Sequence, residues 1–234
     1  MSLLTLVQDA ADRIGLPQPS QVIGSSDTQV RQLLGLAQQE GKELARRGRW
    51  QVLVTEKTFT ATATEEQAST IPSDFDYMVE GSFWNRTQGR QVIGPLTSHR
   101  WQMLKTGLIS NVWDAFRIRG DALLMNPTPT AGDSMAYEYI SKNWCTDAGE
   151  TTPAAKWTSD DDIGLLDEEL MTLGLIWRWM RAKGFDYGEA QRTYETEVEK
   201  QLGRDGGQSL LNLNGDAGAY GPYDPLVPDG NWTI

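Results

Sequence analysis

The sequence predicts an α+β protein: an antiparallel helical bundle formed by N- and C-terminal helix pairs, with a mainly β insertion and an extended C-terminal arm. Three observations support this prediction. Apolar residues recur at helical spacing near both ends, whereas the middle is rich in β-branched residues that alternate in places. After Gly203, glycine, proline, asparagine and aspartate dominate, and no helical period remains. We therefore expect four parts: residues 1–49, 50–157, 158–203 and 204–234.

The N-terminal pair begins with a helix predicted at residues 2–14, whose apolar side chains fall on one face and which Gly15 ends. A second helix starts near Asp27, where Ser26 and Gln29 resemble a capping box. Basic residues at its end suit the helix dipole. Its narrow apolar stripe contains small residues that allow close approach of a neighbouring element: Gly35, Ala37, Gly41 and Ala45.

The middle part is expected to be mainly β, with one short helix at Ser98–Lys105. A glycine–aspartate pair, Gly120 and Asp121, separates two apolar runs and predicts a hairpin. The remaining strands are predicted from Trp50 onward and within residues 69–85, 90–96 and 133–143.

The C-terminal pair is predicted to begin at Asp160, with acids near the start of its first helix and basic residues at the end. The stretch Leu170–Met180 is apolar nearly all round, so we expect it to be buried on several sides. A short break at Gly184–Asp186 makes the two helices antiparallel. The last helix carries an apolar stripe at i, i+4 spacing: Ala190, Tyr194, Val198 and Leu202.

Composition limits the possible functions. The formal net charge is −11, which argues against a nucleic-acid-binding face. The single cysteine, Cys145, excludes an intramolecular disulfide and fits a reducing compartment. The N-terminus lacks a basic leader, and no stretch approaches the roughly 20 apolar residues that span a bilayer. We expect a soluble protein that is made in the cytoplasm and has no membrane partner.

A search for catalytic chemistry finds no convincing constellation. His99 is the single histidine, and the sequence contains no GxSxG motif whose serine it could activate as a base. One histidine and one cysteine cannot build a zinc site. Phosphate-binding loops are absent. We therefore predict no catalytic, cofactor-binding or metal-binding residue. The remaining acidic candidates are better explained as helix caps or as acids that point in different directions: Asp160, Asp161, Asp162, Asp167, Glu168, Glu169 and Glu138.

Nine tryptophans are the other unusual feature of the composition. Burial in a core or at a subunit interface is the commoner role for this side chain. Sugar-binding proteins instead use exposed tryptophans, so a carbohydrate-active protein, whether a cell-wall hydrolase or a sugar-binding module, is the alternative interpretation.

The C-terminal arm combines turn-forming residues with spaced apolar ones. Tails that only solvate a protein lack such apolar residues. The pattern favours an arm that orders on a partner surface, and the alternative is an arm that folds back on its own domain. The predicted contact residues are Leu210, Leu211, Leu213, Tyr220, Tyr223, Leu226, Val227, Trp232 and Ile234.

Three segments resemble the head-to-tail adaptor proteins of tailed bacteriophages, in particular the P22 tail-accessory-factor-like group. The opening SLLTLVQDAADRIGLPQPSQVIGSSDTQVRQLLGLAQQEGKELARRGRWQ is similar to the family's first helix pair. FWNRTQGRQVIGPLTSHRWQMLK is similar to its β insertion, and DDDIGLLDEELMTLGLIWRWMRAKGFDYGEAQRTYETEVEKQL to its second helix pair. The resemblance covers about residues 2–203, and the arm is its least similar part.

The resemblance implies a structural virion protein at the head–tail junction. Such adaptors form a ring, usually of twelve copies, below the portal protein, and their C-terminal arm extends onto the portal. The ring extends the DNA channel, through which DNA passes without specific binding, and receives tail tube, nozzle or fibre proteins. An acidic wall suits a channel that must not retain DNA. A scaffolding or chaperone subunit is a third interpretation.

Overall fold

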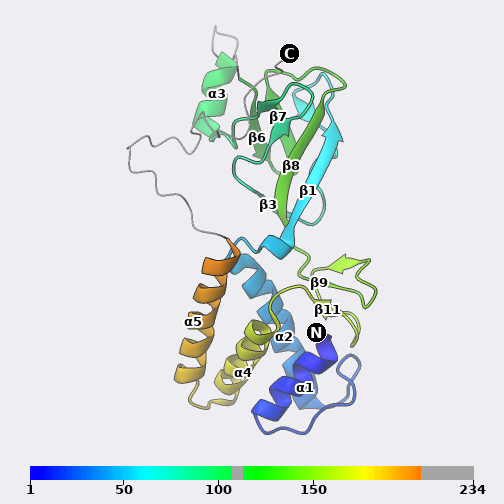
Figure 1. Ribbon diagram of the computed structural model, residues 1–234, viewed down its shortest axis with the longest axis vertical. Helices are drawn as coiled ribbons and strands as arrows, with labels where there is room; N and C mark the ends of the chain where they lie inside the picture. Colours follow the sequence, from blue (N-terminus) through cyan, green and yellow to red (C-terminus); the bar gives the residue numbers. More distant parts are fainter. Residues whose placement is uncertain (107–112, 207–234) are drawn as a thin grey trace. The chain divides into compact units, whose positions relative to one another are not determined.

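The computed structural model describes residues 1–106 and 113–206, which form two compact units (Figure 1). The helical unit comprises residues 1–54 and 141–206, and the β-rich unit comprises residues 55–106 and 113–140. The predicted α+β class is confirmed, because helix pairs from both ends of the chain pack together and antiparallel sheets are inserted between them.

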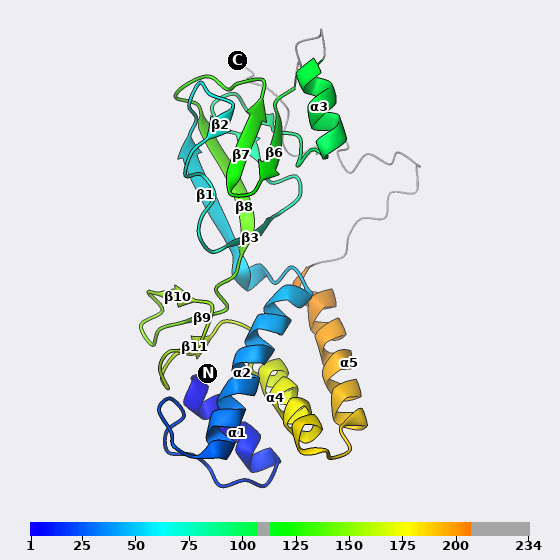
Figure 2. The same cartoon turned by 180° about the vertical axis from the view of Figure 1, so that it is seen from behind.

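Four helices build the helical unit: α1 (Leu3–Arg13), α2 (Thr28–Arg47), α4 (Glu168–Lys183) and α5 (Gly188–Asp205). Helix α4 packs against the other three, as the two opposite views show (Figures 1 and 2). This position explains why α4 is apolar nearly all round. Its buried residues include Leu170, Leu175 and Trp179, which confirms the predicted burial on several sides.

The caps of α2 and α4 correct two sequence predictions. The N-cap of α2 is Asp27 rather than Ser26, because the Asp27 carboxylate accepts the Gln29 amide at 2.7 Å. Helix α4 does not begin at Asp160. Its N-cap is Asp167, whose carboxylate accepts the Leu170 amide at 3.0 Å.

Two acids that were predicted to cap the C-terminal helix instead organise loops. The Asp160 carboxylate accepts the backbone amides of Val22 and Ile23, which belong to the connection between α1 and α2. The Asp162 carboxylate accepts the amides of Thr158 and Ser159 in its own loop. Residues 160–167 therefore form a turn, a two-residue strand and a bend before α4 rather than its first turns.

A small antiparallel sheet completes the helical unit, with strand order β10-β9-β11. Its strands are β9 (Cys145–Thr146), β10 (Pro153–Ala154) and β11 (Ile163–Gly164). Trp144 and Trp157, which flank this sheet, meet edge to face with ring centroids 5.0 Å apart. A Cβ atom on Gly41 would lie 2.4 Å from the Trp144 ring, so α2 accommodates this ring only because residue 41 is glycine.

The main sheet of the β-rich unit has the order β1-β8-β4-β5, and β3 also pairs with β8. The first strand begins at Val54, not at Trp50 as predicted, because a 3-10 turn, η1 (Gln51–Leu53), intervenes. The Leu53 amide closes this turn on the Trp50 carbonyl at 3.0 Å. The strands are β1 (Val54–Thr60), β3 (Phe75–Met78), β4 (Trp84–Asn85), β5 (Arg90–Gln91) and β8 (Ser134–Ser141).

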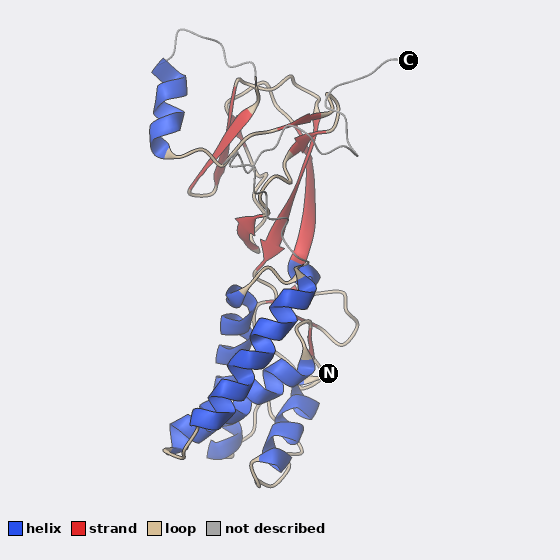
Figure 3. Cartoon of the chain, turned by 60° about the vertical axis from the view of Figure 1, so that its left-hand side comes forward, coloured by secondary structure: helices blue, strands red, loops and turns tan. Residues whose placement is uncertain are grey.

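A second sheet of this unit contains β2 (Glu66–Gln67), β7 (Ala122–Asn126) and β6 (Ala115–Arg119), in that order. Arg119 pairs with Ala122, which confirms the hairpin predicted at Gly120 and Asp121. The predicted short helix is α3 (Ser98–Thr106), drawn in blue beside the strands in Figure 3. The aromatic centre of the core is formed by Phe83, Phe116 and Tyr137.

Candidate functional site

All nine predicted contact residues of the C-terminal arm lie outside the described residues. The structure instead describes where the arm begins, at the last turn of α5 and Gly206. We call this region the arm root. It is defined by the residues that line one pocket of about 340 Å³: Trp50, Val52, Leu166, Asp167, Gln201, Arg204 and Asp205.

Helix α5 approaches the end of α2 very closely at the arm root. A Cβ atom on Gly48 would lie 2.1 Å from a methyl carbon of Leu202, so a side chain at position 48 would force the Leu202 side chain to move. Two helical turns before Leu202, the Glu195 carboxylate of α5 forms a two-pronged ion pair with the Arg47 guanidinium. The last turns of α5 are therefore held against α2 by packing and by charge.

Backbone hydrogen bonds fasten the segment that follows α2 to this site. The Asp205 carboxylate accepts the Gln51 amide at 2.7 Å, so the acid at the end of α5 caps the first residue of η1. The buried Trp50 indole donates its ring N–H to the Leu44 carbonyl at 2.7 Å. As a result, the end of α5, where the arm begins, is hydrogen-bonded directly to the turn that precedes β1.

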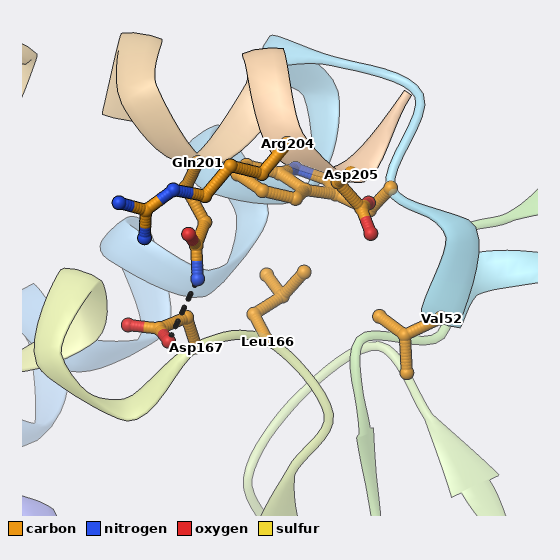
Figure 4. Close-up of a pocket in the computed structure, with 7 residues that line it drawn as sticks. Val52, Leu166, Asp167, Gln201, Arg204 and Asp205 are labelled. Carbon is orange, nitrogen blue, oxygen red and sulfur yellow. Dashed lines mark hydrogen bonds between the residues drawn. The ribbon is translucent and has the colours of Figure 1, made fainter. Parts of the chain in front are cut away.

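The pocket wall combines apolar and charged side chains (Figure 4). Gln201 donates its amide to Asp167 at 3.1 Å, which links the end of α5 to the N-cap of α4. Leu166 and the half-exposed Val52 supply the apolar surface. Within residues 1–106 and 113–206, the exposed Arg204 makes no hydrogen bond or ion pair.

A buried polar cluster stabilises the three helices that carry the arm root. Glu40 of α2 is fully buried; its carboxylate accepts the Tyr194 hydroxyl at 2.7 Å and lies 2.8 Å from Nη1 of Arg178. Arg178 of α4 also reaches Glu43 at 2.5 Å and stacks on Trp177. Because Tyr194 belongs to α5, the cluster joins α2, α4 and α5.

The two acids of this cluster have opposite electrostatic environments. Burial raises the pKa of Glu40 to about 7, and the positive charge of Arg178 offsets only part of this effect. Partial burial also acts to raise the pKa of Glu43. Hydrogen bonds from Gln39 and Arg178 outweigh this effect and hold the pKa of Glu43 below its usual value. A Cβ atom on Gly174 would lie 2.1 Å from the Glu40 carboxylate, so α4 has glycine where this acid approaches.

Sequence reasoning missed Glu40, although a signal for it existed. Position 40 lies three residues after Ala37 and four before Leu44, on the apolar face of α2. Arg178 likewise lies within the apolar run of α4. A single charge inside each of two apolar helix faces is the pattern of a buried ion pair.

The residues that were weighed as chemical candidates are dispersed. His99 is exposed on α3, and Glu138 is exposed on β8. Cys145 is buried, and its thiol donates to the Ala154 carbonyl at 3.1 Å. The Asp167 carboxylate is used as a helix cap. Among the described residues, no group of three or more histidines, cysteines and acids could hold a metal ion.

The tryptophans of the described chain are mostly internal. Six of them are at most 6% exposed: Trp50, Trp101, Trp144, Trp157, Trp177 and Trp179. Trp84 is partly buried and Trp113 is 54% exposed. Core packing therefore accounts for most of the tryptophan content, which weakens the sugar-binding interpretation.

In these features, buried and capped ionisable groups hold a helical bundle together. The chain belongs to the SU10 adaptor protein family, a family of phage structural adaptors whose profile matches residues 1–220. The match confirms the adaptor resemblance and extends it into the arm as far as Tyr220, whereas the P22-like group stays a prediction. None of the curated proteins matches this sequence. None of the described helices is both long and apolar enough to cross a membrane.

Proposed function

We propose that this chain is a head-to-tail adaptor of a tailed phage that forms a ring, of about twelve copies as the resemblance implies, below the portal protein. The observation that carries the proposal is the family match, which includes both helix pairs and the first part of the arm. In this role the ring extends the DNA channel and offers an attachment site for tail tube, nozzle or fibre proteins.

The arm is the part that we assign to the portal. Its apolar residues alternate with glycine, proline and asparagine, a composition suited to an extended segment that binds a complementary surface. One arm alone binds weakly because ordering it costs conformational entropy. A ring presents many arms to a ring of portal subunits, so the weak contacts act together.

The arm root supports this assignment mechanically. Any pull on the arm is transmitted to α5, whose last turn is fixed by the contact of Leu202 with Gly48 and by the hydrogen bond from Gln51 to Asp205. Arg204 and the apolar surface of Leu166 and Val52 lie beside the point where the arm leaves the bundle. A partner segment with an apolar side chain and a carboxylate suits this pocket.

The net charge of −11 also suits a channel protein, since negative walls repel the DNA phosphates. In this proposal DNA passes through the ring without specific binding. Replacing acids on the channel wall with neutral amides should therefore slow DNA ejection, and an unchanged ejection rate would contradict the role of charge.

The experiment that tests the proposal is a truncation after Gly206, which keeps the described bundle and the hydrogen bond of Asp205 intact. The truncated chain should fold, as judged by its circular dichroism, but should fail to join portal rings in electron micrographs. A matched control replaces Asn212 and Asn214 with serine and should leave assembly unchanged. A truncated chain that still binds the portal would contradict the proposed role of the arm.

A further inference from the structure

An apolar groove lies in the β-rich unit between α3 and β6. We call it the α3 groove; its volume is about 170 Å³. Sites for small molecules usually have volumes of about 300–1,000 Å³, so this groove is better suited to one or two side chains of a polypeptide than to a ligand. Its walls come from Arg100, Met103, Leu104 and Trp113, and its floor from Ile93, Leu96 and Ala115.

The floor is held in place by backbone hydrogen bonds to β6 and to Asp114, the residue before it. The Ile93 amide donates to the Asp114 carbonyl at 2.8 Å, and the Leu96 amide donates to the Phe116 carbonyl at 2.9 Å. Between them, a Cβ atom on Gly94 would lie 2.5 Å from the Phe116 carbonyl oxygen, so the close approach depends on glycine. The groove is therefore formed before any partner binds.

The walls expose large apolar side chains. Arg100, Met103 and Leu104 share one face of α3, since they are three and four residues apart. Met103 is 58% exposed and Trp113 is 54% exposed. Large apolar side chains that gather at one exposed place on a soluble unit mark a contact surface.

We propose that the α3 groove receives Leu211 and Leu213 from the C-terminal arm of a second copy of this chain. The inference rests on the proposed function, in which copies lie side by side in a ring. In an extended segment, residues i and i+2 point to the same side, so both leucines enter the groove together.

The opposite charges of the arm and of the groove support the arm as the occupant of the α3 groove. From Gly206 to the end, the chain contains three aspartates and neither lysine nor arginine. Arg100 is the charged residue of the groove wall, and Asp216 follows Leu213 closely enough to approach it. The family match includes both the groove and these leucines, whereas it ends at Tyr220. The later apolar residues of the arm then remain available for the portal.

A disulfide experiment on full-length chains tests this contact. Copies carrying Met103→Cys are mixed with copies carrying Leu211→Cys, assembled on portal rings and oxidised mildly. Since each variant contributes one half of the pair, a mixed disulfide reports a contact between copies. The native Cys145 is buried and does not interfere. We expect the mixed dimer to form at least tenfold faster than with the control Gln102→Cys, which belongs to the same helix but does not line the groove.

Two results would overturn the assignment. Met103→Cys copies that pair mainly with one another would indicate that grooves face each other. Equal rates for Met103→Cys and Gln102→Cys would indicate random collision. Rings that assemble without the preferred disulfide overturn the groove assignment alone, whereas a failure to form rings at all contradicts the proposed function on which it rests.

Discussion

The buried acid of the helical unit should make the stability of the bundle depend on pH in an unusual direction. In the folded chain burial raises the pKa of Glu40 from 4.5 to about 7. Between these values the folded state holds a proton that the unfolded state has lost, so stability falls as pH rises through this window. A pKa shift of this size corresponds to about 3 kcal/mol of unfolding free energy.

The substitution Glu40→Gln removes this titration and keeps an oxygen that can accept the Tyr194 hydroxyl. We expect the variant to gain up to about 3 kcal/mol of stability relative to the wild type between pH 5 and pH 8. Urea unfolding followed by helical circular dichroism measures this difference at each pH. A difference that stays the same at pH 5 and pH 8 would refute the reasoning.

Glu43→Gln is the matched control because Glu43 contacts the same arginine. Its pKa is held below the usual value, so ionised Glu43 stabilises the folded state and this contribution is lost as pH falls through the folded pKa. Between pH 5 and pH 8 the control should therefore differ from the wild type by a constant loss of stability, and this loss should shrink only when pH falls below the ordinary glutamate pKa. A control that behaves like Glu40→Gln would mean that another group controls the pH dependence.

Two further predictions concern packing and reactivity. Gly41→Ala places a Cβ atom 2.4 Å from the Trp144 ring and should lower the unfolding free energy by roughly 1–3 kcal/mol in thermal unfolding. Gly35→Ala, in the same helix but with no neighbour within 4 Å, should raise it by about 0.5–1 kcal/mol; equal effects would contradict the packing of α2. Burial, reinforced by the charge of Asp162, raises the pKa of Cys145 to about 12, so a thiol reagent at pH 8 should label it in urea but not in the native chain. Rapid labelling of the native chain would show that β9 opens.

Local signals were sufficient to predict most of the helices and the hairpin. Helix α1 follows from apolar spacing and from the glycine that ends it, and the turn at Gly120 and Asp121 follows from residues in direct succession. The start of α4 could not be found in this way. The amides that bind the Asp160 carboxylate lie 138 and 137 residues away in the sequence, so a run of acids that looked like a helix cap serves a distant loop.

In the candidate site, too, some features follow from local sequence and others depend on residues that are distant in the chain. The composition of the arm predicts a contact segment from sequence alone, whereas the root of the arm is assembled by the fold. The pocket joins residues from the end of α2, the start of α4 and the end of α5, and no local pattern connects Trp50 with Asp167 or Gln201. The α3 groove likewise depends on a long-range pairing, between Ile93 and β6.

The central claim is that this chain is a permanent part of the virion ring below the portal. Quantitative mass spectrometry of purified virions tests it most directly, with the portal protein as the internal reference. The adaptor role predicts that the chain is present in mature particles at about one copy per portal subunit. Its absence from mature particles would indicate a scaffolding or chaperone subunit, and a few copies per particle would contradict a closed ring.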